Sequence, residues 1–334
     1  MTLSVAIIII LTLGIAFLLV YLVRNIILPR RAALAVSQQD RNKLLRKIRS
    51  LKALLEKEPQ NAEAHYLLGK AYLTDKREEQ AFREYRSASR LGIAGKNIPE
   101  TEFRETLAHL YAKFREEEEA LKEYILLLKS HPENPVYYFQ AGKLFSGRGR
   151  TDLAEQYLKR AVLLNPNDEV FRFELGLHYY LGKKIKEAGN EFEAALKLSP
   201  EDGQSLIYMG KVYKEIKDYT KAIPYLEKAA RHPEYKLRAL VELGSCYMSL
   251  KMLDKAILEL DRAVSSIEKE AEPDSLYARY FLAMCFEKQQ EYTKAIAQWD
   301  KIYAQKKNFR DVGEKLTKYI DYRQGADKET QRKL

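Results

Sequence analysis

The sequence predicts an all-α solenoid of about seven repeats that follows an N-terminal transmembrane helix. The first observation is a pattern of residues that occurs four times between positions 135 and 270. Its copies are evenly spaced, and the spacing is the sequence separation between Ala154 and Ala188. The second is a run of apolar residues between Leu3 and Val23. A repeat of this length cannot bury its apolar face alone, so we expect neighbouring repeats to stack around one continuous core.

Small and aromatic residues stand at fixed positions in these four repeats. Glycine stands at position 8: Gly142, Gly176, Gly210 and Gly244. An aromatic residue stands at position 11: Phe145, Tyr179, Tyr213 and Tyr247. Alanine stands at position 20, as Ala154, Ala188, Ala222 and Ala256, and at position 27, as Ala161, Ala195, Ala229 and Ala263. Pro166 and Pro200 close two of the repeats.

This pattern resembles the tetratricopeptide repeat (TPR) family, which has the same period, about 34 residues, and the same small, aromatic and proline positions. The resemblance implies a right-handed α-solenoid in which each repeat is a pair of antiparallel helices, A and B. It also implies a reason for the glycine, because the neighbouring helix approaches helix A too closely at position 8 for a side chain.

The same register extends in both directions and gives seven repeats in the region 62–309. We place them at 62–95, 101–134, 135–168, 169–202, 203–236, 237–270 and 276–309. The step is longer from Ala81 to Ala120 and again from Ala256 to Ala295. We therefore expect about five inserted residues near 92–100 and near 270–275.

The apolar run near the N-terminus predicts a transmembrane anchor over 3–28. Twenty-one helical residues span about 31 Å, which is enough to cross a bilayer core. A cleaved signal peptide is the alternative, but no Lys or Arg precedes the run. The basic residues that follow it favour a single-pass protein of the cell (inner) membrane with its repeats in the cytoplasm. A periplasmic location of the repeats is the alternative.

The segment 29–61 is expected to form a basic juxtamembrane amphipathic helix. Between Arg24 and Lys57, ten Lys and Arg stand against Asp40 and Glu56. One helical face carries Leu44, Ile48, Leu51 and Leu55. This helix could cap the solenoid, form a coiled coil in a homodimer, or rest its basic residues at 30–57 on anionic lipid headgroups. The remaining chain is nearly neutral, so we expect no nucleic-acid partner.

Beyond the seventh repeat, Val312, Leu316 and Ile320 share one helical face. We expect a capping helix over 310–323, because terminal repeats need a cover with a polar outer side. The charged segment 324–334 is expected to be a disordered tail.

No residue set in the sequence has the spacing of a catalytic or metal site. Pairs such as Gly142-Lys143 lack the Ser or Thr and the earlier glycine of a phosphate loop. Cys246 and Cys285 both fall at position 10 of helix A and are expected in the core. We therefore expect no enzymatic activity, no cofactor and no metal.

In the TPR family, helix A side chains at positions 2, 5, 9 and 12 line a concave groove. The resemblance therefore implies that a groove is lined by Tyr66, Lys70, His109, Phe139, Lys143, Phe173, Leu177, Tyr180, Ile207, Lys211, Lys214, Val241 and Tyr280. Such a surface suits an extended or helical peptide with apolar anchors and one or more acidic groups. The alternative for the position 5 residues is burial between helices.

An anchored repeat array of this kind resembles bacterial envelope scaffolds. We expect a membrane-tethered scaffold or adaptor that binds a peptide segment or a partner helix in its groove. The alternative is a structural subunit of a larger membrane or envelope assembly, of the secretion, pilus or flagellar type, that contacts its neighbours through convex and edge surfaces.

Overall fold

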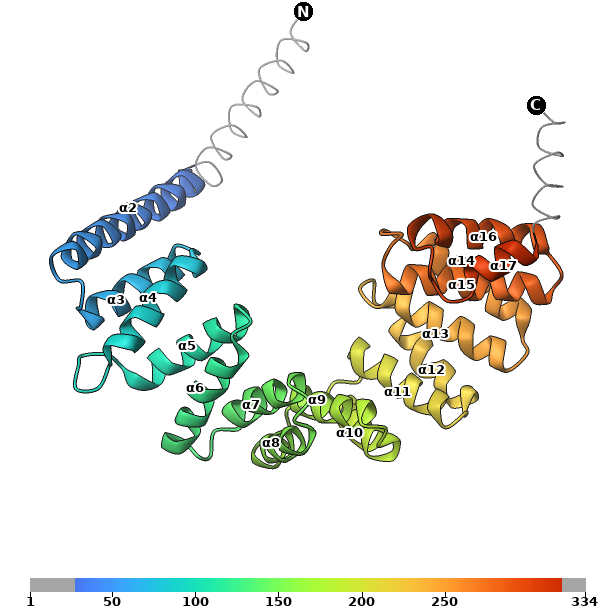
Figure 1. The fold of residues 1–334 in the computed structure, drawn as a ribbon, viewed down its shortest axis with the longest axis horizontal. Helices are drawn as coiled ribbons and strands as arrows, with labels where there is room; N and C mark the ends of the chain where they lie inside the picture. Colours follow the sequence, from blue (N-terminus) through green and yellow to red (C-terminus); the bar gives the residue numbers. More distant parts are fainter. Residues whose placement is uncertain (1–27, 320–334) are drawn as a thin grey trace, which may run out of the picture. The chain divides into compact units, whose positions relative to one another are not determined.

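The computed structural model describes residues 28–319, and its sixteen elements in this range are all helices. The chain divides into an N-terminal unit, residues 1–132, and a C-terminal unit, residues 133–334. Figure 1 labels the helices of both units. The anchor expected over 3–28 and the tail expected over 324–334 lie outside the described residues, apart from residue 28. Among the helices of residues 28–319, none is long and apolar enough to cross a membrane.

The N-terminal unit contains one long helix followed by two helix pairs. Its helices are α2 (Leu28–Lys57), α3 (Ala62–Thr74), α4 (Glu78–Leu91), α5 (Glu100–Lys113) and α6 (Glu117–Ser130). Helices α3 and α4 pack against each other, as do α5 and α6. They are the A and B helices of the repeats 62–95 and 101–134.

The C-terminal unit contains five further helix pairs and a short last helix. Its helices are α7 (Pro135–Gly147), α8 (Thr151–Leu164), α9 (Glu169–Leu181), α10 (Ile185–Leu198), α11 (Gly203–Glu215), α12 (Tyr219–Ala229), α13 (Lys236–Ser249), α14 (Leu253–Ser265), α15 (Pro273–Lys288), α16 (Tyr292–Gln305) and α17 (Val312–Lys318). The odd-numbered helices α7 to α15 are the A helices, and α7 packs beside α9, α9 beside α11, α11 beside α13 and α13 beside α15.

A tight turn of one kind joins helix A to helix B in all seven repeats. Position 15 adopts a positive φ, which is 60° at Lys183 and 61° at Lys251. The next residue donates its backbone N–H to the carbonyl of position 11, as from Lys184 to Tyr179 at 2.9 Å. This is the Schellman arrangement that satisfies the last carbonyls of a helix. Apart from Gly149, the residue in this place is never a glycine, so the other turns adopt a conformation that an L side chain disfavours.

The position 8 glycines have the role that the sequence implied. A Cβ built on Gly176 would lie 2.8 Å from Cε1 of Phe192, and one built on Gly244 would overlap the side chain of Leu260. Phe192 and Leu260 both stand at position 24 of helix B and are fully buried. Helix A therefore packs directly on the position 24 side chain of its own pair.

Helix α2 covers the open side of the first helix pair. Ile48 and Leu51 are buried in a cluster with Leu68 and Tyr72 of α3, and Leu44 and Leu55 pack against the same cluster. The apolar face of α2 is therefore occupied by α3, as the capping hypothesis requires. A coiled coil through this same face would have to displace α3.

A polar contact between positions 4 and 23 joins the two helices of four repeats. The contacts are His65 Nδ1 to Glu84 Oε2 at 2.6 Å, Arg104 to Glu123 at 2.8 Å, Arg172 to Glu191 at 3.1 Å and Arg279 to Gln298 at 2.9 Å. These side chains are largely buried between helices A and B, where an unpaired charge would be costly. Each contact therefore adds to the specificity of its helix pair.

Helix α17 covers the last helix pair of the C-terminal unit. Val312 is fully buried and Leu316 is 8% exposed, in the same cluster as Trp299 of α16. The ring of Tyr319 stacks on Trp299 with centroids 5.8 Å apart. The capping helix that the sequence predicts over 310–323 is described as far as residue 319, and its helical part is α17.

Candidate functional site

The position 5 residues of the predicted groove are buried between helices. Their exposed fractions are 3% at Tyr66, 6% at Phe139, 9% at Phe173, 1% at Ile207, 5% at Val241 and 6% at Tyr280. The ring of Phe139 stacks on Phe171 with centroids 4.6 Å apart, and Phe173 packs on Phe192 at 5.6 Å. These six side chains hold the stacked helices together, which is the alternative that the sequence left open for position 5.

The other predicted groove residues lie at least partly on the surface. In the N-terminal unit these are Lys70 on α3 and His109 on α5, both exposed. The Nζ atom of Lys70 lies 2.6 Å from Glu102 Oε1, and both side chains are about half exposed. The hydrogen bond that Lys70 donates to Glu102 raises the pKa of this lysine. A pair this exposed contributes little to stability, on the order of 1 kcal/mol or less.

In the C-terminal unit, side chains from four A helices form a common surface, which we call the A-helix face. It comprises Val136, Gln140 and Lys143 of α7, Val170, Glu174, Leu177 and Tyr180 of α9, Tyr208, Lys211 and Lys214 of α11, and Glu242, Ser245 and Met248 of α13. On each helix these residues are three or four positions apart, so they share one side of the helix. Five predicted groove residues, Lys143, Leu177, Tyr180, Lys211 and Lys214, therefore lie on this face.

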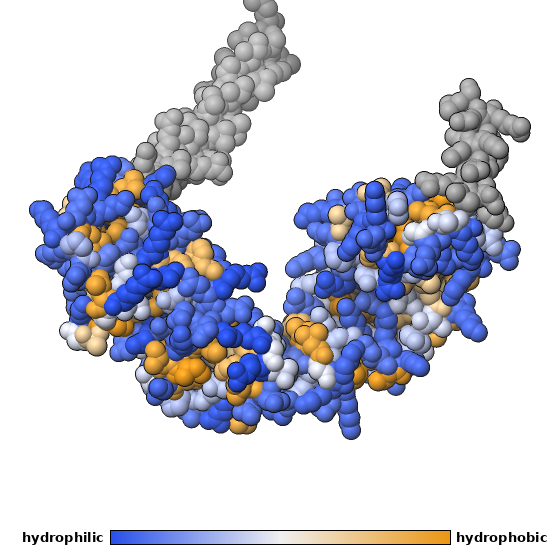
Figure 2. Space-filling model, in the orientation of Figure 1, coloured by the Kyte–Doolittle hydropathy of each residue, from blue (hydrophilic) through white to orange (hydrophobic). Residues whose placement is uncertain are grey.

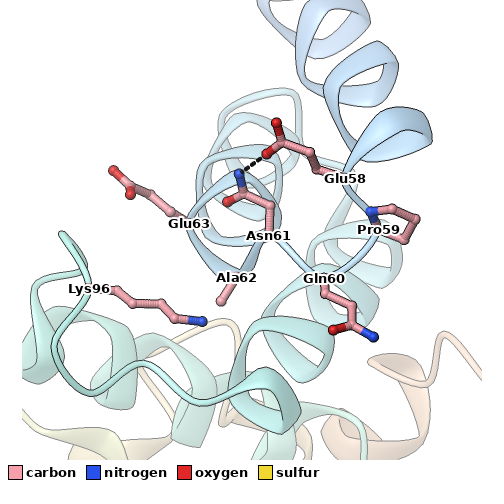
Figure 3. Close-up of a pocket in the computed structure, with 7 residues that line it drawn as sticks. All are labelled: Glu58, Pro59, Gln60, Asn61, Ala62, Glu63 and Lys96. Carbon is pink, nitrogen blue, oxygen red and sulfur yellow. Dashed lines mark hydrogen bonds between the residues drawn. The ribbon is translucent and has the colours of Figure 1, made fainter.

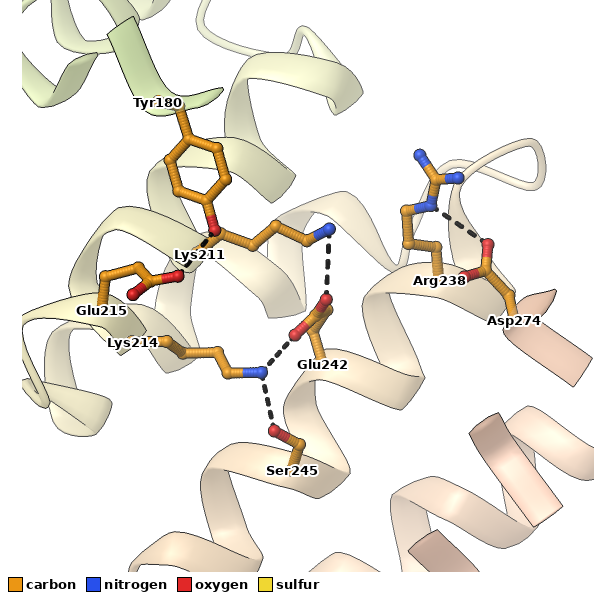
Figure 4. A network of polar contacts seen from close by, with 8 residues as sticks. All are labelled: Tyr180, Lys211, Lys214, Glu215, Arg238, Glu242, Ser245 and Asp274. Atoms are coloured by element: carbon orange, nitrogen blue, oxygen red, sulfur yellow. Dashed lines mark hydrogen bonds and ion pairs between the residues drawn. The ribbon is translucent and has the colours of Figure 1, made fainter. Parts of the chain in front are cut away.

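Two of the predicted lysines share one carboxylate of the chain itself (Figure 4). Glu242 of α13 accepts from Lys214 and lies 3.3 Å from the Nζ of Lys211, both on α11. The Nζ of Lys214 also donates to Ser245 Oγ at 2.6 Å. Burial disfavours the charged form of Glu242, but the attraction of the two lysines outweighs it and lowers the pKa of this carboxyl. Lys211 and Lys214 are therefore partnered within the fold.

The other polar groups around this cluster are also paired. The hydroxyl of Tyr180 donates to Glu215 at 3.2 Å, and Lys183 lies 3.6 Å from the same carboxylate. Nearby, Arg238 Nε donates to Asp274 at 3.0 Å (Figure 4). A cleft of about 420 Å³ lies here, lined by Tyr180, Lys211, Lys214, Glu215, Lys217, Tyr219, Glu242 and Ser249.

Glu174, on α9, is the carboxylate of the A-helix face that lacks such a pair among the described residues. It is partly buried, and it makes no hydrogen bond or ion pair with another described residue. Burial raises its pKa, although the charge of Lys143 opposes this effect. The Nζ of Lys143 lies instead over the ring of Phe139, 5.3 Å from its centroid.

Neither Glu174 nor Glu242 is among the predicted groove residues, although the sequence contains a signal for both. Lys143 stands at position 9 of its repeat, and Glu174 stands at position 6 of the next repeat. Lys211 and Glu242 stand at the same two positions, so both pairs have the same separation in sequence. Because neighbouring A helices pack side by side, this spacing places each glutamate beside the preceding lysine. A search for charges at a step slightly shorter than the repeat would have found them.

A second pocket, of about 550 Å³, lies in the N-terminal unit near the start of α3 (Figure 3). It is lined by Glu58, Pro59, Gln60, Asn61, Ala62, Glu63 and Lys96. The Asn61 side chain accepts from the backbone N–H of Ala64 at 2.9 Å and donates to Glu58 at 2.8 Å. The first of these bonds caps α3, so the central polar side chain of this pocket already has a structural role.

Within residues 28–319, no group of three or more His, Cys, Asp or Glu side chains could hold a metal ion. Cys246 and Cys285 are free and fully buried. Burial raises the pKa of each thiol to about 11. Both side chains are therefore held as neutral core groups at physiological pH.

The exposed surface is mainly hydrophilic, with hydrophobic residues in separate patches (Figure 2). On the A-helix face, Val136 is 46% exposed and Val170 is 51% exposed. On the B helices, Leu163 of α8 is 69% exposed and Leu258 of α14 is 60% exposed. Two surfaces of the C-terminal unit therefore offer apolar side chains to a partner.

Comparison with known proteins gives one family. The tetratricopeptide repeat model matches residues 33–95, 139–203, 209–271 and 265–310. No curated protein matches the chain. Among solved structures, a tetratricopeptide repeat protein from Parabacteroides merdae is 16% identical, with a TM-score of 0.56 over 80% of this chain and 98% of that one.

A second solved structure, the APC/C hetero-tetramer Cut9-Hcn1, is also similar. It is 16% identical, with a TM-score of 0.56 over 82% of this chain and 52% of the matched chain. At these identities the similarity concerns the fold alone.

Proposed function

Since the chain belongs to the tetratricopeptide repeat family, we propose that it is a protein–protein interaction scaffold, tethered to a membrane, that holds a segment of a partner on its A-helix face. The observation that carries this proposal is the make-up of that face. Exposed Val136 and Val170 lie on α7 and α9, and a charged cleft of about 420 Å³ lies across α9, α11 and α13. Apolar anchors beside a few fixed polar groups suit a peptide segment.

The tether is proposed from the sequence and from the basic side of α2. The apolar run Leu3–Val23 precedes α2, and an anchor over 3–28 would place this helix beside the bilayer. Exposed cations of α2 with no ion pair in the described chain are Arg41, Arg46, Lys47, Arg49, Lys52 and Lys57. Cations near anionic headgroups contribute about 1 kcal/mol each, so this side of α2 would add to the attachment.

The charge asymmetry around the apolar run supports an inner-membrane protein with its repeats in the cytoplasm. A protease-sensitive tag placed after Leu334 tests this location. We expect the tag to survive in intact cells and in cells whose outer membrane alone is permeabilised. Cleavage after outer-membrane permeabilisation would place the repeats in the periplasm.

The alternative function, a structural subunit that contacts neighbours through outer surfaces, is favoured by the exposed Leu163 and Leu258 on B helices. A photo-crosslinking amino acid at Val170 tests the A-helix face, and the same amino acid at Leu258 is the matched control, because both side chains are more than half exposed. We expect one protein, identified by mass spectrometry, to be crosslinked through one segment at Val170 and not at Leu258. Crosslinking at Leu258 alone would support the structural subunit instead.

A further inference from the structure

We propose that Glu174 is the anchor for a lysine or arginine side chain of the segment that binds the A-helix face. This inference rests on the proposed function, because it assigns the chemistry of the partner at one point of the same surface. It also reverses the charge that the sequence alone suggested, since the lysines of the groove had favoured acidic groups on the partner.

Three other carboxylates on or beside the A-helix face have partners within the chain. Glu242 has two lysines, Glu215 has Tyr180 and Lys183, and Asp274 has Arg238. Glu174 has no such partner within the described residues. A partly buried carboxylate that lacks hydrogen bonds loses hydration without compensation, so a cation supplied from outside gains the full charged interaction.

The preceding repeat lacks the second cation that would pair with Glu174 from within the chain. Glu174 and Glu242 both stand at position 6 of their repeats. In both cases the A helix of the preceding repeat has a lysine at position 9. The helix before Glu242 has a second cation at position 12, Lys214, whereas the helix before Glu174 has Ser146 there. Lys143 is exposed and lies over the Phe139 ring, which attracts its charge.

Apolar residues stand beside Glu174 on the same helical side. On α9, Val170 stands one turn before Glu174 and Leu177 stands three residues after it, so all three share one helical side. Val170 is 51% exposed, and Val136 stands at the same repeat position on the adjacent α7. A basic residue with an apolar residue beside it fits this surface, and a guanidinium could donate two charged hydrogen bonds to the carboxylate.

The test uses the full-length chain in nanodiscs of neutral phospholipid. The probes are four pools of fluorescein-labelled, amidated nonapeptides whose central residue is fixed as Arg, Lys, Gln or Glu and whose other positions are random. Fluorescence polarisation measures the affinity of each pool. We expect the Arg and Lys pools to bind about tenfold more tightly than the Gln pool, the effect of one charged hydrogen-bonded pair.

Glu174→Gln should remove the preference for Arg and Lys over Gln. Glu187→Gln is the matched control, because it makes the same change in the same repeat at an exposed glutamate of α10 that lies outside the A-helix face, and it should retain the preference. Lys143→Ala should retain or increase it, since the competing cation is removed. Circular dichroism verifies that each variant is folded.

Two other results would overturn the proposal in different ways. Equal binding of the Arg and Gln pools to the wild type, or loss of the preference in Glu187→Gln as complete as in Glu174→Gln, would contradict the assignment and leave the A-helix face as the binding surface. Absence of binding by all four pools would contradict the proposed function and the assignment with it.

Discussion

Two repeats of the C-terminal unit carry glutamate at the same position, and the surrounding chain treats the two residues differently. In the repeat 237–270, Glu242 is paired with two lysines, which lower its pKa. In the repeat 169–202, Glu174 has no hydrogen-bonded partner among the described residues, and burial raises its pKa. The helix pairs themselves are alike, since both have the position 8 glycine, the position 24 core side chain and the same turn.

The difference arises in the repeat before each glutamate. Lys214 of α11 reaches Glu242, and α7 has Ser146 at the same position. The hairpin fold is therefore set within a repeat, whereas the charge state of the A-helix face depends on residue pairs between repeats. A family pattern describes the first kind of contact well and the second poorly.

The largest expected effect tests what the two repeats share. Gly176→Ala and Gly244→Ala each place a Cβ less than 3 Å from a buried position 24 side chain. We expect each change to lower the free energy of unfolding by about 2–3 kcal/mol, because the helix pair must separate slightly. Urea denaturation followed by circular dichroism measures this. A loss smaller than about 0.5 kcal/mol in either repeat would mean that the A and B helices are not in such close contact.

The next effect separates the two repeats. Glu242→Gln leaves Lys211 and Lys214, each about one quarter exposed, without their shared carboxylate. We expect a loss of about 1–2 kcal/mol in the free energy of unfolding. Glu174→Gln should cost less than about 0.5 kcal/mol, or stabilise the chain, because no hydrogen bond is lost. Equal losses in the two variants would show that Glu174 has an unrecognised partner in the fold.

A pH series should give opposite trends for the two glutamates. Because the folded-state pKa of Glu242 is lowered, its contribution is present above the ordinary value of 4.5 and is lost as the pH falls through the folded-state pKa. The folded-state pKa of Glu174 is raised, so the wild type should lose stability relative to Glu174→Gln as the pH rises from 4.5 through that pKa. Urea denaturation at each pH measures the free energy of unfolding of the wild type relative to each variant. If this relative stability changes with pH in the same direction for Glu242→Gln and for Glu174→Gln, the two glutamates do not differ as described.

The smallest effect concerns the turns. Lys251→Gly should raise the free energy of unfolding by about 0.5 kcal/mol, since glycine adopts the positive φ of 61° more readily than lysine. Lys183→Gly should gain less, because Lys183 also lies 3.6 Å from Glu215. Gly149→Lys, at the same position of another repeat, is the reverse change and should destabilise the chain. A destabilised Lys251→Gly variant would mean that the lysine side chain itself supports the turn.

The sequence predicted the helical repeats well because their small residues have a steric cause. A small residue at position 8, which is alanine at Ala108 and Ala283 and glycine in the other five repeats, and alanine at position 20 stand where helices A and B cross closely, so they recur in the sequence. The turns could not be predicted in the same way. Their positive φ is adopted by Lys76, Arg115 and four other residues that have no propensity for it, and the helix-ending hydrogen bonds impose it.

The surface was predicted less well, for two physical reasons. Position 5 residues such as Phe173 and Ile207 face the groove in the family pattern, but large apolar side chains at this position close the space between neighbouring A helices and are buried. The lysines at positions 9 and 12 resemble free cations in the sequence, yet Lys211 and Lys214 are paired with an acid in the following repeat. The charged residues within one repeat do not show which residue of the next repeat pairs with them.

The most direct test of this account is a carboxyl titration of Glu174 and Glu242 in the full-length chain. Glutamate labelled with ¹³C at the side-chain carboxyl, assigned with Glu174→Gln and Glu242→Gln, reports each pKa by NMR. We expect Glu242 to titrate below 4.5 and Glu174 to titrate above it, and we expect the Arg peptide pool to lower the pKa of Glu174 alone. Titration of both carboxyls together, or a response of Glu242 and not Glu174 to the peptides, would contradict it.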